Sequence, residues 1–314
     1  MNIISLFAGC GGLDLGFEKY FQPTFKANFP NTRLIEGDIN IPSDAFPNNM
    51  TGIIGGPPCQ AWSEGGKQLG FEDPRGQLFL EYVRIVKLKR PKFFVIENVQ
   101  GILEDKHKLS LAFIIRSLQS IGYSIKYQLL NAADYRIPQD RFRVFFVGIR
   151  NDLQNTFTFP TAVTDKKITL KEAIGDIIES PRFFNEETIT EEHPTRKNHD
   201  VYTGSYDAKY MARNRVRSWN EQSFTIQAQA RNEPQHPQAP KMTYISSDKR
   251  IFAKGYELLY RRLSVRECAR IQTFPDSFVF IYTDIKNGYK MVGNAVPPRL
   301  AYAIAIQIRN ALPQ

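Results

Sequence analysis

Short apolar runs recur along the first half of the chain, and a turn rich in glycine or polar residues follows each of them. The runs lie at residues 2–7, 53–54, 93–96 and 144–149. An unbroken apolar run, rather than an alternating one, is typical of strands that are covered on both faces of a parallel sheet. Between the second and third runs, apolar side chains recur at helical spacing: Leu78, Tyr82, Ile85 and Val86. Strand, helix and strand in this order predict an α/β fold with a right-handed crossover.

Capping signals and periodicity predict further elements. Residues 107–121 have the pattern of an amphipathic helix, and residues 124–131 have that of a strand. Ser264, with Glu267 in the third position after it, forms a capping box, so we expect a helix to begin there. The last helix is predicted at residues 301–311.

The pattern changes at about residue 151. From there to residue 256 the periodicity weakens, while polar residues, prolines and charges increase. A chain of 314 residues is long enough for two domains, so we expect a second, irregular one. Within it, residues 218–241 combine planar amides, arginine and aromatic side chains. That mixture suits contacts with base edges and phosphates, but it also occurs in ordinary exposed loops.

Composition limits the class of protein. Lysine and arginine number 41 against 32 for aspartate and glutamate, a net charge of +9. This excess is compatible with a polyanionic partner, although many basic enzymes have none. Cys10, Cys59 and Cys268 are too scattered for a disulfide framework, and no cysteine or histidine pair has metal-ligand spacing. The sequence shows no signal peptide and no apolar run of roughly 20 residues, so we predict a cytoplasmic, reduced protein without a bound metal.

The candidate nucleophile is Cys59, which follows an apolar strand and the turn Gly55-Gly56-Pro57-Pro58. The glycines let the backbone leave the strand sharply, and the prolines stiffen the exit. Glu97 ends the next predicted strand. Parallel strands bring their carboxyl ends to one edge of a sheet, which is where ligands of open α/β sheets bind. A thiol and a carboxyl group at that edge suit covalent catalysis. The alternative is a tight turn with a small buried thiol.

Three other features carry weaker signals. The glycine-rich turn at residues 8–16 could bring a ligand close to the backbone at a helix N-terminus, although it lacks the full dinucleotide pattern. Gln139, Arg141 and Arg143 alternate, so in extended chain they point to one side, where they could hold a phosphate or support Glu97. A solvated arginine face is the alternative. The long polar loop at residues 60–75 suits a lid, or a loop without function.

Six short motifs follow one another in a fixed order. They are Phe7-x-Gly9-x-Gly11-Gly12, Gly56-Pro57-Pro58-Cys59-Gln60, Glu97-Asn98-Val99, Gln139-x-Arg141-x-Arg143, Arg262-Leu263 through Phe274-Pro275, and Gly293-Asn294-Ala295-Val296-Pro297. Together they resemble the DNA (cytosine-5) methyltransferase family over nearly the whole chain. The resemblance implies a Rossmann-like α/β domain that depends on S-adenosylmethionine, with a smaller, irregular target-recognition domain inserted. Residues 1–162 and 276–314 would form the catalytic, cofactor-binding domain, and residues 163–275 the target-recognition domain.

The resemblance also implies a role for each matching position. Cys59 adds to carbon 6 of cytosine, Glu97 bonds the ring at nitrogen 3, and Asn98, Arg141 and Arg143 complete the catalytic set. S-adenosylmethionine, which leaves as S-adenosylhomocysteine, is expected to contact Phe7, Ala8, Gly9, Gly11, Gly12, Tyr20, Asp38, Ile39, Pro58, Leu78, Asn294 and Val296. DNA is expected to contact Gln60, Ser63, Arg75, Thr225, Gln227 and Arg231. Cys10 and Cys268 match no catalytic position and are expected to be core thiols.

Residues 223–229 and 236–241 further resemble the subgroup that modifies GGCC. The expected partner is double-stranded DNA, in a restriction-modification system whose endonuclease need not touch this chain. A base inside a duplex must be flipped out to reach Cys59. Three other hypotheses stay open: an RNA cytosine-5 methyltransferase, a thymidylate-synthase-like enzyme that uses the same addition, and a non-catalytic DNA-binding relic. The long polar insert, the glycine-rich turn and the presence of both Cys59 and Glu97 favour the DNA methyltransferase.

One part of the family pattern is missing. In this family an acid at the end of the second strand holds the cofactor ribose, the usual job of an acid about 20 residues beyond a glycine-rich turn. Here Lys19 continues directly into Tyr20 without an apolar strand, and neither Glu18 nor Glu36 is a convincing substitute. We therefore expect about one strand of residues to be unrecorded between Lys19 and Tyr20. If the two are joined by a peptide bond, the strand is absent and cofactor affinity should be weak.

Overall fold

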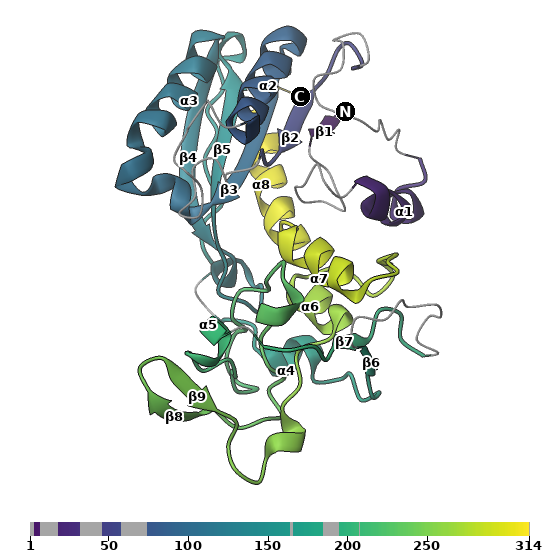
Figure 1. Cartoon of the computed structure of the whole chain (residues 1–314). Coiled ribbons are helices and arrows are strands. Elements are labelled where there is room, and N and C mark those ends of the chain that lie inside the picture. Colours follow the sequence, from purple (N-terminus) through teal and green to yellow (C-terminus); the bar gives the residue numbers. More distant parts are fainter. Residues whose placement is uncertain are drawn as a thin grey trace.

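The computed structural model describes residues 3–6, 18–31, 46–57, 74–163, 166–184, 195–206 and 208–313 (Figure 1). Its main sheet has five strands in the order β1-β2-β3-β5-β4. The strands are β1 (Ile3–Leu6), β2 (Gly52–Gly55), β3 (Phe93–Val99), β4 (Tyr123–Asn131) and β5 (Phe142–Arg150). β1, β2 and β3 are parallel, whereas β5 runs antiparallel to both β3 and β4. The predicted α/β fold is therefore confirmed, with an antiparallel pair at one side of the sheet.

Helices cover both faces of this sheet. α2 (Pro74–Lys89) and α3 (Lys108–Ser120) share one buried cluster with Phe94 and Ile96 of β3. α8 (Pro298–Ala311) shares another with Phe93 of the same strand. Neighbouring side chains of a strand point to opposite faces, so both faces of β3 are filled, as its unbroken apolar run predicts.

A second buried core lies in the lower part of Figure 1. It is built mainly from α4 (Leu170–Ile174), α6 (Val265–Ile271) and α7 (Ile285–Asn294). Around it are the parallel pair β6 (Arg182–Phe184) and β7 (Asp200–Tyr202), the hairpin of β8 (Thr243–Ser246) and β9 (Lys249–Ile251), and α5 (Ala208–Met211). Short 3-10 turns lie at Gln100–Leu103, Asp105–His107, Ala132–Tyr135, Asn151–Leu153, Ala230–Asn232 and Glu257–Leu259.

This second core continues past the predicted domain boundary. It runs from Leu170 to Ala295 and so includes α7, which lies beyond residue 275. Only α8 returns to the main sheet. The division at residues 162 and 275 stays a prediction, and packing joins residues 276–295 to the target-recognition side.

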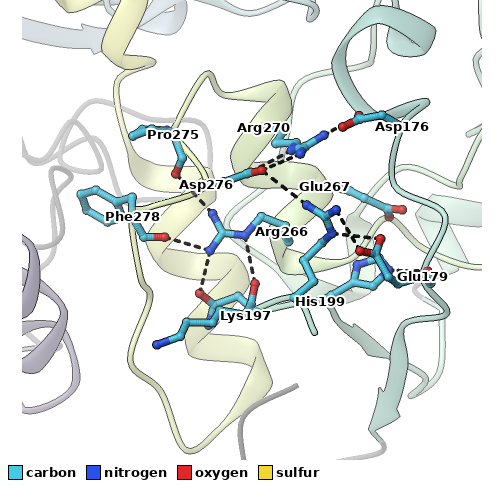
Figure 2. Close-up of polar contacts among 12 residues, drawn as sticks. Asp176, Glu179, Lys197, His199, Arg266, Glu267, Arg270, Pro275, Asp276 and Phe278 are labelled. Atoms are coloured by element: carbon cyan, nitrogen blue, oxygen red, sulfur yellow. Dashed lines mark hydrogen bonds and ion pairs between the residues drawn. The ribbon is translucent and has the colours of Figure 1, made fainter. Parts of the chain in front are cut away.

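Arginines of α6 tie the second core together (Figure 2). Arg266 is fully buried and donates to the carbonyl oxygens of Lys197 at 3.0 Å and Phe278 at 2.8 Å. Arg270 pairs with both Asp176 and Asp276. One short helix thus fastens three segments that are distant in sequence.

Most predicted element boundaries are close to the observed ones. The capping box is confirmed, because the Ser264 hydroxyl accepts from Glu267 N and the Glu267 carboxylate accepts from Ser264 N. The last helix begins at Pro298 rather than at residue 301, as proline suits the first turn of a helix. Cys268 is a buried core thiol, as expected. Cys10 lies outside the described residues.

α1 (Glu18–Asn28) runs as one helix through Lys19 and Tyr20. The expectation of unrecorded residues between these two stays a prediction. α1 docks onto the loop before α7: Thr24 Oγ1 accepts from Ile281 N at 2.7 Å, and Asn28 exchanges two hydrogen bonds with the backbone of Val279.

Candidate active site

The carboxyl ends of the first three strands form one edge of the sheet. In register, Leu6 lies beside Gly55 and Gly55 beside Ile96, so the chain segments leading to residue 7, Cys59 and Glu97 leave the sheet together. A Cβ atom at Gly55 would lie 2.6 Å from the carbonyl oxygen of Leu6, which explains the glycine. Cys59 itself lies outside the described residues. Its turn is described as far as Pro57, which is buried.

Asn98, near the end of β3, connects this strand to the turn that follows β2. Its side-chain amide donates to the carbonyl oxygen of Pro57 at 3.2 Å, and its Oδ1 accepts from Val99 N at 2.8 Å. The side chain is 3% exposed. A buried amide with both ends satisfied fixes its neighbours, because breaking either bond would leave a polar group unpaired. Asn98 therefore anchors the backbone just before the candidate nucleophile.

Glu97 is held by an ion pair. Arg143 Nε lies 2.9 Å from Glu97 Oε1, and the two side chains are 16% and 10% exposed. The residues come from β3 and β5, where Val99 is the direct partner of Arg143, so the pair is a diagonal one across the two strands. The prediction that this arginine row supports Glu97 is confirmed for Arg143.

Arg141 has other partners than those expected. The hypothesis that it orients Glu97 is not supported by any hydrogen bond, since its guanidinium donates to the carbonyl oxygens of Ile226 (3.1 Å), Gly293 (2.9 Å) and Ala295 (3.1 Å). Burial lowers the pKa of Arg141, and the neighbouring Arg143 lowers it further. Its Nε atom is buried and has no hydrogen-bond partner among the described residues.

Gln139 contacts the same main-chain segment as Arg141, at Ile226. Its Nε2 donates to Gln272 Oε1 at 2.6 Å, and its Oε1 accepts from Ile226 N at 3.2 Å. The backbones of α7 and this segment also pack closely, since a Cβ atom at Gly293 would lie 2.0 Å from the carbonyl oxygen of Gln227. Gln139 and Arg141 are buried, so this part of the row is not a solvated face. The two side chains connect the main sheet, the 223–227 segment and α7.

The predicted cofactor-binding residues that the structure describes lie in different elements. Leu78 is buried in the core beneath the sheet, Val296 is partly buried against the α8 core, and Asn294 ends α7. Tyr20 and Arg75 lie in the first turns of α1 and α2. The remaining cofactor candidates and two DNA candidates lie outside the described residues: Phe7, Ala8, Gly9, Gly11, Gly12, Asp38, Ile39, Pro58, Gln60 and Ser63.

The three DNA candidates of the second domain lie on one segment. Thr225 Oγ1 donates to the carbonyl oxygen of Asp140 at 2.6 Å, and Gln227 Nε2 donates to that of Thr225 at 3.2 Å. Arg231 is exposed in the 3-10 turn Ala230–Asn232. Thr225 therefore fastens the segment, and Arg231 is the side chain that points outward.

Sequence reasoning missed Gln272 and Asp140. Gln272 also donates to the carbonyl oxygen of Val292 at 2.8 Å, and Asp140 pairs with Arg217 at 3.4 Å. The only signal for either was its place within or next to a motif. Among the described residues, no group of histidine, cysteine and acidic side chains could hold a metal ion, and no helix is long and apolar enough to cross a membrane.

The chain matches the family described as C-5 cytosine-specific DNA methylase over residues 1–310. It belongs to that family. This C-5 cytosine-specific DNA methylase is 48% identical to the Type II methyltransferase M.NgoPII of Neisseria gonorrhoeae, over 99% of this chain and 96% of the relative. It is 36% identical to M.BsuRI of Bacillus subtilis, over 99% of this chain and 79% of the relative. The alignment with M.NgoPII spans 336 residues, more than the 314 of this chain, so that relative has residues that this chain lacks.

Solved structures show the same fold. The methylase superposes on a DNA modification methyltransferase encoded within an E. coli prophage with a TM-score of 0.73 at 22% identity, over 99% of both chains. It superposes on the Entamoeba histolytica methyltransferase EhMeth with a TM-score of 0.68 at 16% identity, over 98% of this chain and 97% of the other. The Rossmann-like α/β fold is thus shared over the full length.

Proposed function

We propose that this DNA cytosine-5 methyltransferase acts on a cytosine flipped out of duplex DNA, through a covalent adduct with Cys59. The observation that carries the proposal is the pair of contacts at the carboxyl edge. Asn98 holds the backbone before Cys59, and Arg143 holds the carboxylate of Glu97. The backbone that leads to the proposed nucleophile and the carboxylate of the proposed acid are thereby held by neighbouring strands, which suits covalent catalysis.

The chemistry explains why these residue types are needed. The Cys59 thiolate forms a bond to carbon 6, and Glu97 bonds nitrogen 3 so that the ring accepts a proton there. The electron pair then lies at carbon 5, which can take a methyl group. Loss of the carbon 5 proton to a base and cleavage of the bond to Cys59 restore the aromatic ring. Arg141 Nε, which has no partner among the described residues, is proposed as a donor to the edge of the base.

The methyl donor is proposed to be S-adenosylmethionine, which supplies an electrophilic methyl group when bound. The fit is partial. β1 and β2 end just before the candidate residues Phe7 and Pro58, Glu97 lies in the last part of β3, and this carboxyl edge is where ligands of such sheets bind. The acid expected for the ribose is missing, because residues 7–31 contain only Asp14 and Glu18 as acids.

Sequence recognition is assigned to the second core and to Arg231 in particular. An exposed arginine on an otherwise fastened segment is suited to bidentate contact with guanine. GGCC is the proposed site, and a restriction endonuclease of the same specificity is the proposed companion in a Type II system. Bisulfite sequencing of exposed DNA determines the site, and methylation at another motif would refute GGCC while leaving the reaction assignment intact.

A trapping experiment tests the reaction. Wild type should form a denaturation-resistant complex with a duplex containing 5-fluorocytosine, because fluorine cannot leave as the carbon 5 proton does. Cys59→Ser should lose trapping and nearly all turnover but still bind DNA. Ser124→Ala, at an exposed position on β4, is the control and should trap normally. Trapping by Cys59→Ser would overturn the assignment, and preferential methylation of transfer RNA would favour the RNA alternative.

A further inference from the structure

The segment between Gln227 and Glu233 is closed at both ends. At the first end Arg141 Nη1 donates to the carbonyl oxygen of Ile226 and Gly293 abuts that of Gln227. Inside the segment, Asn232 donates twice to Gln229, from its backbone N and from its Nδ2, both at 2.9 Å. Gln229 and Arg231 are its exposed side chains. The residues between are therefore presented on a loop of fixed shape.

Glu233 closes the second end from inside the protein. Its side chain is 0% exposed. Oε2 accepts from Cys268 Sγ of α6 at 3.7 Å, and the carboxyl group lies near the main-chain N–H of Gln227. Oε1 has no hydrogen-bond partner among the described residues. One carboxyl group thus lies between the start of the loop and its end, and it is fastened to the helix beneath.

We infer that Glu233 is a positioning residue for DNA recognition, which holds the Gln227–Arg231 loop in the shape that reads the duplex. The inference rests on the proposed function, since it presumes that this loop contacts DNA. A loop that is ordered before binding loses less conformational freedom when the complex forms. Glu233 itself is buried, so it acts through Gln227 and Arg231 without touching the DNA.

Burial raises the pKa of Glu233 well above its usual range, and the Cys268 thiol, the main-chain N–H of Gln227 and the charges of Arg215 and Arg262 do not offset this. The two arginines donate elsewhere, Arg215 to the carbonyl oxygen of Asn232 and Arg262 to that of Tyr202. A neutral glutamine of the same shape should therefore replace Glu233, because its amide oxygen still accepts from Cys268 Sγ.

The test compares three variants of the full chain with wild type, with duplex DNA and tritiated S-adenosylmethionine. Glu233→Ala should raise KM for DNA about tenfold and widen the set of methylated sites, while kcat at saturating DNA stays within about twofold. Glu233→Gln should restore wild-type KM and site selection. Ile174→Ala, in the same buried core but on α4, is the control for lost stability and should lower Tm without changing KM.

Two results would overturn the inference while the proposed function stands. In one, wild type methylates DNA and Glu233→Ala keeps its KM and its sites. In the other, Glu233→Gln is as impaired as Glu233→Ala, which would mean that bulk packing or a negative charge matters. Wild type that methylates no duplex would instead overturn the proposed function, and with it the role of the loop in reading DNA.

Discussion

Arg143 on β5 reaches diagonally across the sheet to Glu97 on β3, and the two side chains meet at 2.9 Å. Because the pair is mostly buried, removing one member leaves the other without its partner. Arg143→Ala should lower kcat by about 10- to 100-fold, and Glu97→Gln by about 10²- to 10⁴-fold. The double variant should be little worse than Glu97→Gln alone, since both changes remove one unit. Fully multiplicative losses in single-turnover rates would show that the pair does not act together.

Asn98 offers a second test at the same edge. Asn98→Ala removes the donor to Pro57 O and the acceptor for Val99 N, so the free energy of unfolding should fall by about 1–3 kcal/mol. The turn that carries Cys59 should also lose its fixed position, and adduct formation should slow. Urea titration and trapping kinetics measure the two effects. Ser124→Ala, which removes an exposed hydrogen bond on the same sheet, should cost less than about 0.5 kcal/mol.

Acid should weaken the second core through His236. Burial lowers the pKa of His236 to about 4 from 6.5, although Glu267 lies 3.6 Å away. Arg261 already pairs with Glu267 at 2.7 Å, which leaves that carboxylate little need of a second cation. Between these two pKa values the unfolded chain binds more protons than the folded one, so stability falls as pH drops from 6.5 towards 4.

The size of this effect can be measured against a variant. Unfolding free energy at pH 5 should be about 2 kcal/mol lower than at pH 8 on account of His236. His236→Gln keeps a polar side chain that cannot titrate, so it should show a flatter dependence over the same range. If the unfolding free energy falls equally with pH in both proteins, groups other than His236 cause the loss of stability in acid.

Cofactor affinity should be low for this family. The missing ribose acid costs a charge-assisted hydrogen bond of about 1.5–3 kcal/mol, or roughly 10- to 100-fold in Kd. Isothermal titration with S-adenosylmethionine and S-adenosylhomocysteine measures this without turnover. A chimera that takes residues 7–31 from the aligned part of M.NgoPII should bind more tightly. Equal affinities would show that another side chain holds the ribose.

The sequence predicts local features of this protein well. The apolar run around Phe94 identifies a strand because burial on both faces demands continuous apolar character. Ser264 and Glu267 identify a helix start because the cap is local. Such signals need no knowledge of distant residues.

Long-range partners could not be predicted in the same way. Arg141 donates to three main-chain carbonyl groups, and a carbonyl group has no sequence signature. Alternation alone suggested one shared direction for Gln139, Arg141 and Arg143, but β5 begins only at Phe142, so the three do not share one extended strand. α7 was missed because Gly288, Gly293 and Asn294 are typical of turns, and its stability comes from burial against α6.

The packing of α8 has a consequence for how the protein is made. Phe93 and Val147 face this helix, yet it is the last helix described and leaves the ribosome long after them. One face of the main sheet is thus bare during most of translation, while the second core, complete by Ala295, can form first. Nascent chains stopped before residue 298 should therefore expose apolar strands and recruit chaperones, whereas release of α8 should make the sheet resistant to protease.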